Sequence, residues 1–261
     1  MARDIVVFTL HKSGSMFLHR QCEMLCSASG LAYHSPNVPG SGLDARRLLT
    51  DPDIWRTRHG CFAPVRFYVA IPQLTDYEVL LHLRDPRDVL VSMFYSYCYI
   101  HPGEVPPDTG YRRQTAEEGI DAFVLAKASA MSRRYPGDYG TGGHVEDLIG
   151  NLPTRYEHYV RHLVGRANVT LLRYEEMVSD YPRWLSGFAR PFPLPDREQR
   201  LEDWSARSRS FFPQRSSDVM SHVRHVTPGD FRLKLQPATI RKLDTIFAPT
   251  LDALGYERYA G

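Results

Sequence analysis

Short apolar runs alternate along the chain with longer segments whose apolar residues recur at helical spacing. Compact apolar runs that are rich in β-branched residues predict buried strands at residues 4–9, 77–83 and 168–173, with shorter extended segments at 31–34 and 60–69. Amphipathic spacing predicts helices at residues 15–28, 44–49, 86–97, 115–133, 145–164, 175–189, 196–207 and 237–254. Pro64 is an obstacle to a regular central strand at 60–69, and Pro182 predicts a break in the helix at 175–189. Residues 208–236 are predicted to be irregular.

This alternation predicts an α/β fold, in which a central parallel sheet is flanked by helices on both faces. No repeat and no domain boundary interrupts the pattern, so a single domain is expected over residues 1–261. Ligands of such sheets bind outside the carboxyl ends of the strands. The loops after Phe8, His34, Leu83 and Arg173 are therefore expected to share one functional edge.

Composition narrows the class of protein. The net charge of +2 over 261 residues argues against bulk binding of nucleic acid or of a membrane surface, and no run of 18 apolar residues predicts a membrane span. The N-terminus enters a strand pattern at once, without the apolar region of a signal peptide. The four cysteines predict no disulfide framework, and Cys22 and Cys26 are interpreted as buried small side chains more readily than as a metal pair. A reducing, cytoplasmic location is expected.

The segment HKSGSMFL at residues 11–18 separates the first strand from the first helix. A strand, a tight loop and a helix N-terminus in this order can hold an anion, because backbone N–H groups and the helix dipole converge there. Lys12 adds a full charge, Ser13 and Ser15 add hydroxyl donors, and Gly14 allows the backbone to approach closely. The spacing fits neither the P-loop nor the G-x-G-x-x-G pattern. An ordinary strand-to-helix turn that carries a lysine is the alternative.

A second anion site is indicated where the strand at 77–83 ends. Arg84 follows this strand, and Ser92 lies eight residues further on, inside the next helix. An arginine grips a phosphate with two parallel N–H bonds, and a serine hydroxyl can add a third. The alternative is that Arg84 pairs locally with Asp85 or Asp88.

Four motifs together resemble a known family. The chain carries HKSGSMF at 11–17, RDPRDVLVS at 84–92, YEEM at 174–177 and RHVTPGD at 224–230. These resemble, in order, P-K-S-G-T-T-W, R-[DN]-P-[RK]-D-x-x-x-S, Y-E-D-M and R-K-G-x-x-G-D. That set belongs to sulfotransferases that use 3'-phosphoadenosine 5'-phosphosulfate (PAPS), and the resemblance is to bacterial-type members related to the cytosolic enzymes.

The resemblance implies a role for each matching position. The 5'-phosphosulfate would be cradled by Lys12, Ser13, Gly14, Ser15 and Met16, and Lys12 would also stabilise the leaving oxygen. Phe17 would stack on the adenine and Tyr174 would contact it. Arg84, Ser92 and Arg224 would bind the 3'-phosphate, with His225 standing where the family has lysine. Because histidine is a weaker cation at neutral pH, the role of His225 differs from that of the family residue.

Removal of the acceptor's proton needs a base, and the family's K-T-H motif is missing. His34, at the end of the second predicted strand, is the favoured candidate, and His59 is the alternative. Either is otherwise interpreted as a solvent-facing loop histidine. Lysine, arginines and a helix N-terminus supply the electrostatics of sulfuryl transfer, so no metal is expected.

The predicted function is transfer of a sulfuryl group from PAPS to a hydroxyl of a small-molecule, lipid or sugar (glycan) acceptor. His101, His222, Tyr95, Tyr97, Tyr99, Phe211 and Phe212 lie in segments expected near the acceptor or donor. Two rivals stay open: a nucleotide kinase with a degenerate P-loop, which would need Mg²⁺, and a nucleotide-binding protein that lacks transferase activity. Nothing in the pattern indicates an oligomeric state.

Overall fold

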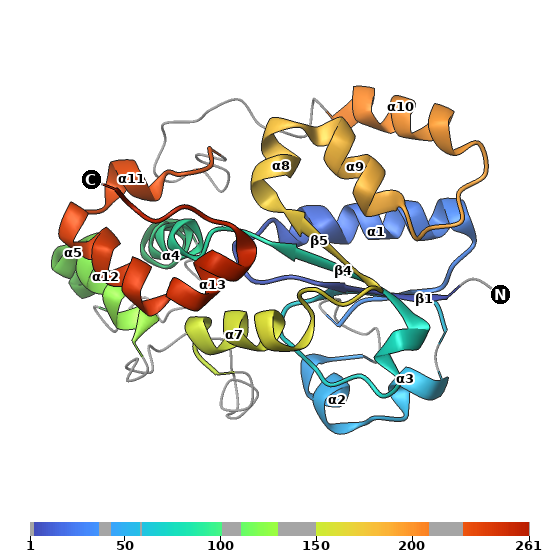
Figure 1. Cartoon of the computed structure of the whole chain (residues 1–261), viewed down its shortest axis with the longest axis horizontal. Coiled ribbons are helices and arrows are strands. Elements are labelled where there is room, and N and C mark those ends of the chain that lie inside the picture. Colours follow the sequence, from blue (N-terminus) through green and yellow to red (C-terminus); the bar gives the residue numbers. More distant parts are fainter. Residues whose placement is uncertain are drawn as a thin grey trace. The chain divides into compact units, whose positions relative to one another are not determined.

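The computed structural model describes residues 3–36, 43–57, 59–100, 111–129, 150–208 and 227–260 (Figure 1). The chain separates into two compact units. Unit 1 comprises Met1–Leu83 and Leu163–Phe212, and unit 2 comprises Arg84–His162 and Pro213–Gly261. The prediction of one domain over residues 1–261 stays a prediction.

Unit 1 is built on a five-stranded sheet. Its strands are β1 (Asp4–Phe8), β2 (Tyr33–His34), β3 (Cys61–Val65), β4 (Tyr77–Leu83) and β5 (Val169–Arg173). They pair in the order β2-β3-β1-β4-β5, and every pair is parallel. The predicted parallel α/β fold is thereby confirmed, and the carboxyl ends of all strands lie at one edge.

Pro64 does not exclude a central strand, contrary to the expectation from sequence. It lies inside β3, which is paired on one side with β2 and on the other with β1. The register between β1 and β3 shifts between Val6 and Phe8, beside this position. Proline has no N–H to donate, and the sheet accommodates it by this local irregularity instead of ending the strand.

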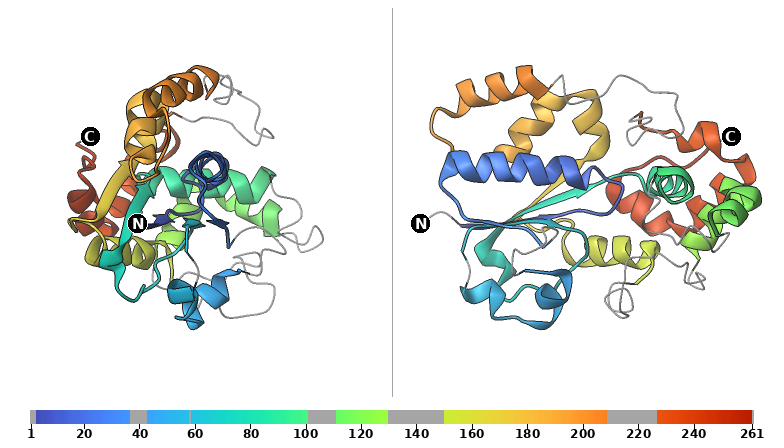
Figure 2. Two further views of the ribbon diagram at one scale, coloured as in Figure 1. Left: turned by 90° about the vertical axis from the view of Figure 1, so that its right-hand side faces the viewer. Right: turned by 180° about the vertical axis from the view of Figure 1, so that it is seen from behind.

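Helices cover both faces of the sheet of unit 1 (Figure 2). One face carries α1 (Ser15–Ser29), α8 (Tyr174–Ser179), α9 (Tyr181–Ala189) and α10 (Arg197–Ser208). The other carries α2 (Ala45–Thr50) and α3 (Ile54–Thr57), and a 3₁₀ turn, η1 (Leu74–Asp76), precedes β4. The predicted break near Pro182 is confirmed, because Asp180 separates α8 from α9 and its side chain accepts the Arg183 N–H.

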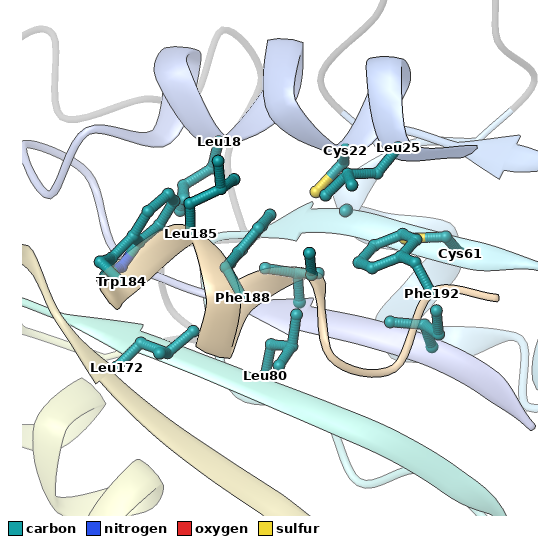
Figure 3. Packing of buried hydrophobic residues seen from close by; sticks show 14 of the residues in the cluster. Leu18, Cys22, Leu25, Cys61, Leu80, Leu172, Trp184, Leu185, Phe188 and Phe192 are labelled. Carbon is teal, nitrogen blue, oxygen red and sulfur yellow. The ribbon is translucent and has the colours of Figure 1, made fainter. Parts of the chain in front are cut away.

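The core of unit 1 lies between the sheet and the helices α1 and α9 (Figure 3). Trp184, Leu185 and Phe188 of α9 meet Leu18 and Cys22 of α1 and, from the strands, Leu80 and Leu172. All four cysteines are buried free thiols. A contact with the Cys61 thiol, together with burial, raises the pKa of Cys26 well above its usual value, so Cys26 stays protonated. Its role is that of a small apolar side chain, as the sequence predicts.

Unit 2 is helical in the part of the chain that the structure describes. Its elements are α4 (Pro86–Tyr95), the π-helical turn η2 (Ser96–Ile100), α5 (Tyr111–Ala128), α7 (Leu152–His162), α11 (Phe231–Lys234), α12 (Pro237–Ile246) and α13 (Ala248–Leu254). Asp85 accepts the Arg87 N–H at the start of α4, with Pro86 in the first turn, as predicted.

Two predictions for unit 2 are wrong. The single closing helix expected at 237–254 is two helices, because Phe247 leaves the helical conformation with ψ near 10°. Pro249, in the first turn of α13, cannot donate to the preceding turn, which favours this break. Ile246, an apolar residue at the end of α12, is exposed. The segment 208–236 also contains a short helix, α11, which the sequence interpretation missed.

The described residues include neither a helix suited to span a membrane nor a metal-binding cluster. None of their helices combines the length and the apolar character needed to cross a bilayer. No cluster of three or more histidine, cysteine, aspartate or glutamate side chains within the described ranges is arranged to hold a metal ion.

Candidate functional site

The loop between β1 and α1 has the backbone conformation of an anion cradle. Lys12 and Gly14 both adopt the left-handed conformation, with φ of 64° and 77°. No side chain caps α1, whose first helical bond runs from the Leu18 N–H to the Gly14 carbonyl at 3.0 Å. The N–H groups of the first turn and the positive end of the helix dipole therefore face the loop, where an anion is favoured.

Gly14 is required by packing as well as by its backbone angle. A Cβ at this position would lie 3.3 Å from Cε of Met177 and 3.4 Å from Cε2 of Tyr174. Both neighbours belong to the YEEM segment that begins α8. The loop and this motif thus form one packed structure, which the separate sequence motifs did not reveal.

The two serines of the loop are buried in the structure. Ser13 is fully buried and Ser15 nearly so, whereas Met16 is exposed. The Ser13 N–H donates to the Leu10 carbonyl at 3.4 Å. Neither serine side chain is exposed to solvent, because the loop packs tightly onto the sheet. The role of the two hydroxyls as donors to an anion in the loop stays a prediction.

Arg66 adds a second cationic side chain beside the loop. It follows the last residue of β3 and so lies at the carboxyl edge of the sheet. Its Nη2 donates to Sδ of Met16 at 3.3 Å. The guanidinium and the α1 N-terminus therefore place positive potential in the same region as Lys12.

Both aromatic residues that the resemblance assigns to adenine contact the core. Phe17 packs edge-on against Tyr181, with ring centroids 5.9 Å apart, and lies 6.1 Å from the ring of Trp184. Tyr174 is buried against Gly14. These contacts show that each ring supports the loop, and contact with adenine stays a prediction.

The structure does not bring His59 to Lys12, because His59 lies at the opposite edge of the sheet. Its Nδ1 is 2.9 Å from Oδ2 of Asp4, the first residue of β1, and the Gly60 N–H donates to the same carboxylate. The loop with Lys12 follows the other end of β1, about 13 Å along the strand. In a parallel sheet, a residue that precedes one strand and a residue that follows another lie at opposite edges. His59 precedes β3 and Lys12 follows β1, so the two residues lie apart.

His34 also turns away from the loop. Its Nε2 donates to the His59 carbonyl at 3.0 Å, and its ring packs on Phe62 at 5.0 Å between centroids. The register aligns His34 with Phe62, and Phe62 with Val6, so β2 stops short of the carboxyl end of β1. The structure does not bring His34 to Lys12, because the hydrogen bond draws its ring toward the amino edge.

His82 is a histidine of the site that the sequence interpretation missed. It lies on β4, two residues after Leu80 and on the same face of the sheet, and it is fully buried. Burial lowers its pKa to about 3, although the nearby Ser13 backbone favours the protonated ring. A histidine inside an apolar strand next to an Arg-Asp-Pro turn was the available signal.

In unit 2, Arg84 is buried in the first turn beyond β4. The Tyr156 hydroxyl donates to its carbonyl at 2.5 Å, and its Nη2 lies 3.8 Å from Oδ2 of Asp88. The local partner that the sequence offered as an alternative therefore exists, at a distance too long for a strong bond. Ser92 lies two turns along α4 and is partly exposed.

Asp88 is a second residue whose importance the sequence interpretation missed. Its carboxylate accepts the Gly229 N–H at 2.8 Å and the Phe231 N–H at 2.9 Å. Burial raises its pKa, which the Arg84 charge and these two N–H groups oppose. Asp88 thus fixes to α4 the end of the RHVTPGD motif that begins at residue 224.

Several predicted residues lie outside the described residues. These are Arg224 and His225 of the proposed 3'-phosphate site, and His101, His222, Phe211 and Phe212. Of the predicted aromatic residues, Tyr97 packs on Phe123 with centroids 6.0 Å apart, and the Lys127 ammonium lies 5.2 Å from its ring. Core packing in unit 2 accounts for Tyr97.

The comparisons with known proteins agree with this geometry. The sulfotransferase domain family matches residues 70–255, well over half of the chain. A search of curated protein sequences found no match.

Solved structures of similar fold include mouse sulfotransferase SULT7A1 complexed with PAP, at 17% identity and a TM-score of 0.60, covering 99% of this chain and 90% of that one. Retinol dehydratase in a complex with retinol and PAP is similar at 13% identity and a TM-score of 0.55, covering 95% of this chain and 81% of the other. At these identities the likeness shows a shared fold.

Proposed function

Because the chain belongs to the sulfotransferase domain family, we propose that it transfers a sulfuryl group from PAPS to a hydroxyl group of a small molecule, lipid or sugar. The observation that carries the proposal is the loop at residues 11–14, with two left-handed residues, Lys12 and an uncapped helix N-terminus. The similar sulfotransferase and retinol dehydratase structures are named as complexes with PAP, the nucleotide left when PAPS loses its sulfuryl group. A cytoplasmic location stays a prediction.

In this proposal the donor's 5'-phosphosulfate lies on the loop of residues 12–16. Lys12 and the N–H groups of the first α1 turn bind it, and Arg66 adds charge beside Met16. The 3'-phosphate is assigned to Arg84, Ser92 and Arg224, with His225 nearby, as the resemblance implies. Phe17 and Tyr174 are assigned to the adenine.

The reaction exchanges one S–O bond for another. The acceptor oxygen bonds to sulfur while the bond from sulfur to the bridging phosphate oxygen breaks, giving a sulfate ester, PAP and a proton. Negative charge grows on the bridging oxygen, where Lys12 and the helix N-terminus stabilise it more in the transition state than in the ground state. No metal is needed for this stabilisation.

His11 is proposed as the base. Unit 1 contains five histidines, and all five are described. His34 and His59 turn to the amino edge, His82 is buried, and His19 contacts the Tyr33 hydroxyl at 2.5 Å. His11 adjoins Lys12 and is only partly buried. His11→Ala should lower kcat by about 10²-fold or more while leaving the affinity for PAP nearly unchanged.

The decisive experiment combines binding and turnover. Isothermal titration calorimetry measures the affinity for PAP, and labelled PAPS with alcohols, phenols and sugars measures transfer. Lys12→Ala should lower transfer by about 10²–10³-fold, as loss of one donor to a developing oxyanion does. Arg20→Ala removes a positive charge from an exposed position on the same helix and serves as the matched control.

The outcomes separate the proposal from its rivals. Absence of PAP binding by the wild-type protein would contradict the proposal. Mg²⁺-dependent turnover of a nucleotide without a 3'-phosphate would establish a nucleotide kinase. PAP binding with no transfer to any acceptor class would favour a binding protein.

A further inference from the structure

Beneath the loop of unit 1 lies a group of buried polar side-chain atoms that make no hydrogen bond of ordinary geometry, although the Ser13 backbone interacts weakly with the His82 ring. They are Oγ of Ser13, both ring nitrogens of His82 and Nε1 of Trp184. The three residues are at most 1% exposed. Buried polar groups in native proteins are nearly always hydrogen-bonded, so several without partners in one place indicate that a bound group completes their pairing.

These residues come together from three parts of unit 1. His82 projects from β4 toward the face covered by α1 and α9, because it shares the side of Leu80, a core residue. The Trp184 ring of α9 stands almost perpendicular to the imidazole, at 83° and with centroids 5.6 Å apart. The backbone of Ser13 is near enough to shift the imidazole's titration. His82 therefore lies between the core and the anion loop.

The chemistry of the three side chains is complementary. Because burial lowers the pKa of His82 to about 3, its ring is neutral at pH 7 and has one N–H donor and one acceptor nitrogen. The indole of Trp184 can only donate, whereas the hydroxyl of Ser13 can donate and accept. These bonds are not made in the structure, but one rearrangement of the three side chains would satisfy all of them. In it Trp184 would donate to His82, His82 would donate to the Ser13 oxygen, and the Ser13 proton would point into the loop.

We propose that His82 is a positioning residue for the donor's 5'-anion, which it serves by holding Ser13 from below once the anion enters the loop. The inference rests on the proposed function, since it assigns the loop to the phosphosulfate. His82 touches neither the donor nor the acceptor. It acts through Ser13, and Trp184 fixes which nitrogen of the imidazole carries the proton. Entry of the anion supplies an acceptor for the Ser13 hydroxyl and so closes the chain of hydrogen bonds.

The test compares two nucleotides that differ only in the 5'-phosphate, the group that the loop is proposed to bind. PAP carries a 5'-phosphate and adenosine 3'-phosphate does not, so the ratio of their affinities isolates what the loop contributes. His82→Phe should weaken PAP binding about tenfold, the factor that one ordinary hydrogen bond is worth. It should leave the affinity for adenosine 3'-phosphate within twofold. His82→Gln keeps a donor and an acceptor and should restore most of the PAP affinity.

Two further variants sharpen the result. Trp184→Phe removes the indole N–H but keeps an aromatic ring. It should weaken the binding of PAP, but not of adenosine 3'-phosphate, by a smaller factor than His82→Phe does. Cys26→Ala alters the same core without adjoining the loop and should change neither affinity. The inference would be overturned if His82→Phe lowered the affinities for both nucleotides equally, or lowered neither of them.

A measurement on the wild-type protein does not depend on the folding of any variant. In NMR spectra of protein labelled with ¹⁵N-histidine, saturating PAP should move the ¹⁵N chemical shifts of His82 to those of a single, hydrogen-bonded neutral tautomer. If the wild-type protein binds neither nucleotide, the proposed function is contradicted, but the role of His82 is still testable. The same spectra are then recorded with inorganic pyrophosphate as the anion instead of PAP. Unchanged His82 signals at saturating pyrophosphate would contradict the role of His82.

Discussion

Both units bury polar side chains next to a motif of the predicted site, but the two groups of side chains differ in their hydrogen bonding. In unit 2, Arg87 donates to Asp85 at 2.6 and 2.9 Å and to Asp244 at 2.6 Å, and its guanidinium lies 4.2 Å from the Phe231 ring. Asp88 accepts two backbone N–H groups. In unit 1, Ser13, His82 and Trp184 retain buried polar atoms that make no hydrogen bond.

The contrast separates two uses of a polar motif. Much of the RDPRD segment is architectural, because its charges hold α11 and α12 to α4. The polar atoms beneath the HKSGSMF loop have no such architectural partner, which is the arrangement expected where a ligand completes the pairing. Sequence motifs mark both segments equally, so only the contacts in the structure distinguish residues with architectural partners from the residues that we propose to act at the loop.

The largest effect is expected from Arg87→Met. This change leaves the Asp85 and Asp244 carboxylates buried without their cation, which should lower the free energy of unfolding by about 3–5 kcal/mol. Urea unfolding followed by circular dichroism measures it. All three tryptophans, Trp55, Trp184 and Trp204, belong to unit 1, so fluorescence follows that unit separately.

The matched control for Arg87→Met is Arg47→Ala. It breaks the exposed ion pair with Asp51, which should change the free energy of unfolding by less than about 0.5 kcal/mol. If the two variants lost similar stability, the buried network of unit 2 would not have the structural role assigned to it.

An intermediate effect is expected from pH at His82. Its pKa is about 3 in the folded chain and 6.5 in the unfolded chain, so between these values the unfolded state binds the additional proton. Stability is therefore fully present above pH 6.5 and falls on acidification, by up to about 1.4 kcal/mol per pH unit. From pH 6 to pH 4 the wild-type protein should lose roughly 2–3 kcal/mol more than His82→Gln. Parallel pH profiles of the two proteins, recorded by tryptophan fluorescence during urea unfolding, would contradict a buried neutral His82.

The smallest of the three effects compares two left-handed glycines of α1. Gly14→Ala and Gly30→Ala both place a side chain at φ near 70°, which costs about 1–2 kcal/mol each. Gly30 has open space around its Cβ position, whereas Gly14 faces Met177 and Tyr174. Gly14→Ala should cost about 1 kcal/mol more, measured by urea unfolding. Calorimetry should show that Gly14→Ala weakens PAP binding and that Gly30→Ala does not. Equal PAP affinities in the two variants would argue against the loop as the anion site.

Much of the fold follows from local sequence. The runs at 4–9 and 77–83 become β1 and β4 because they are apolar on both faces, and Asp44, Asp85 and Asp180 each start a helix by accepting a backbone N–H. A helix cap and a continuous apolar run can be recognised from neighbours within a few residues. Pro64 and the segment 237–254 were misjudged because a strand's place in the sheet and a helix's packing partners are set by distant residues.

The sequence by itself determined the parallel sheet, the loop that follows β1 and the motifs of the family. The tertiary structure decided which side chains meet there. It placed His34 and His59 toward the amino edge of the sheet, away from Lys12, packed Gly14 against Tyr174 and Met177, and brought His82 next to the Ser13 backbone. The physical reason is that strand direction, register and the facing helix fix these contacts, and the residues in contact are separated by 25 to 163 positions. Local pattern carries no information about such pairs.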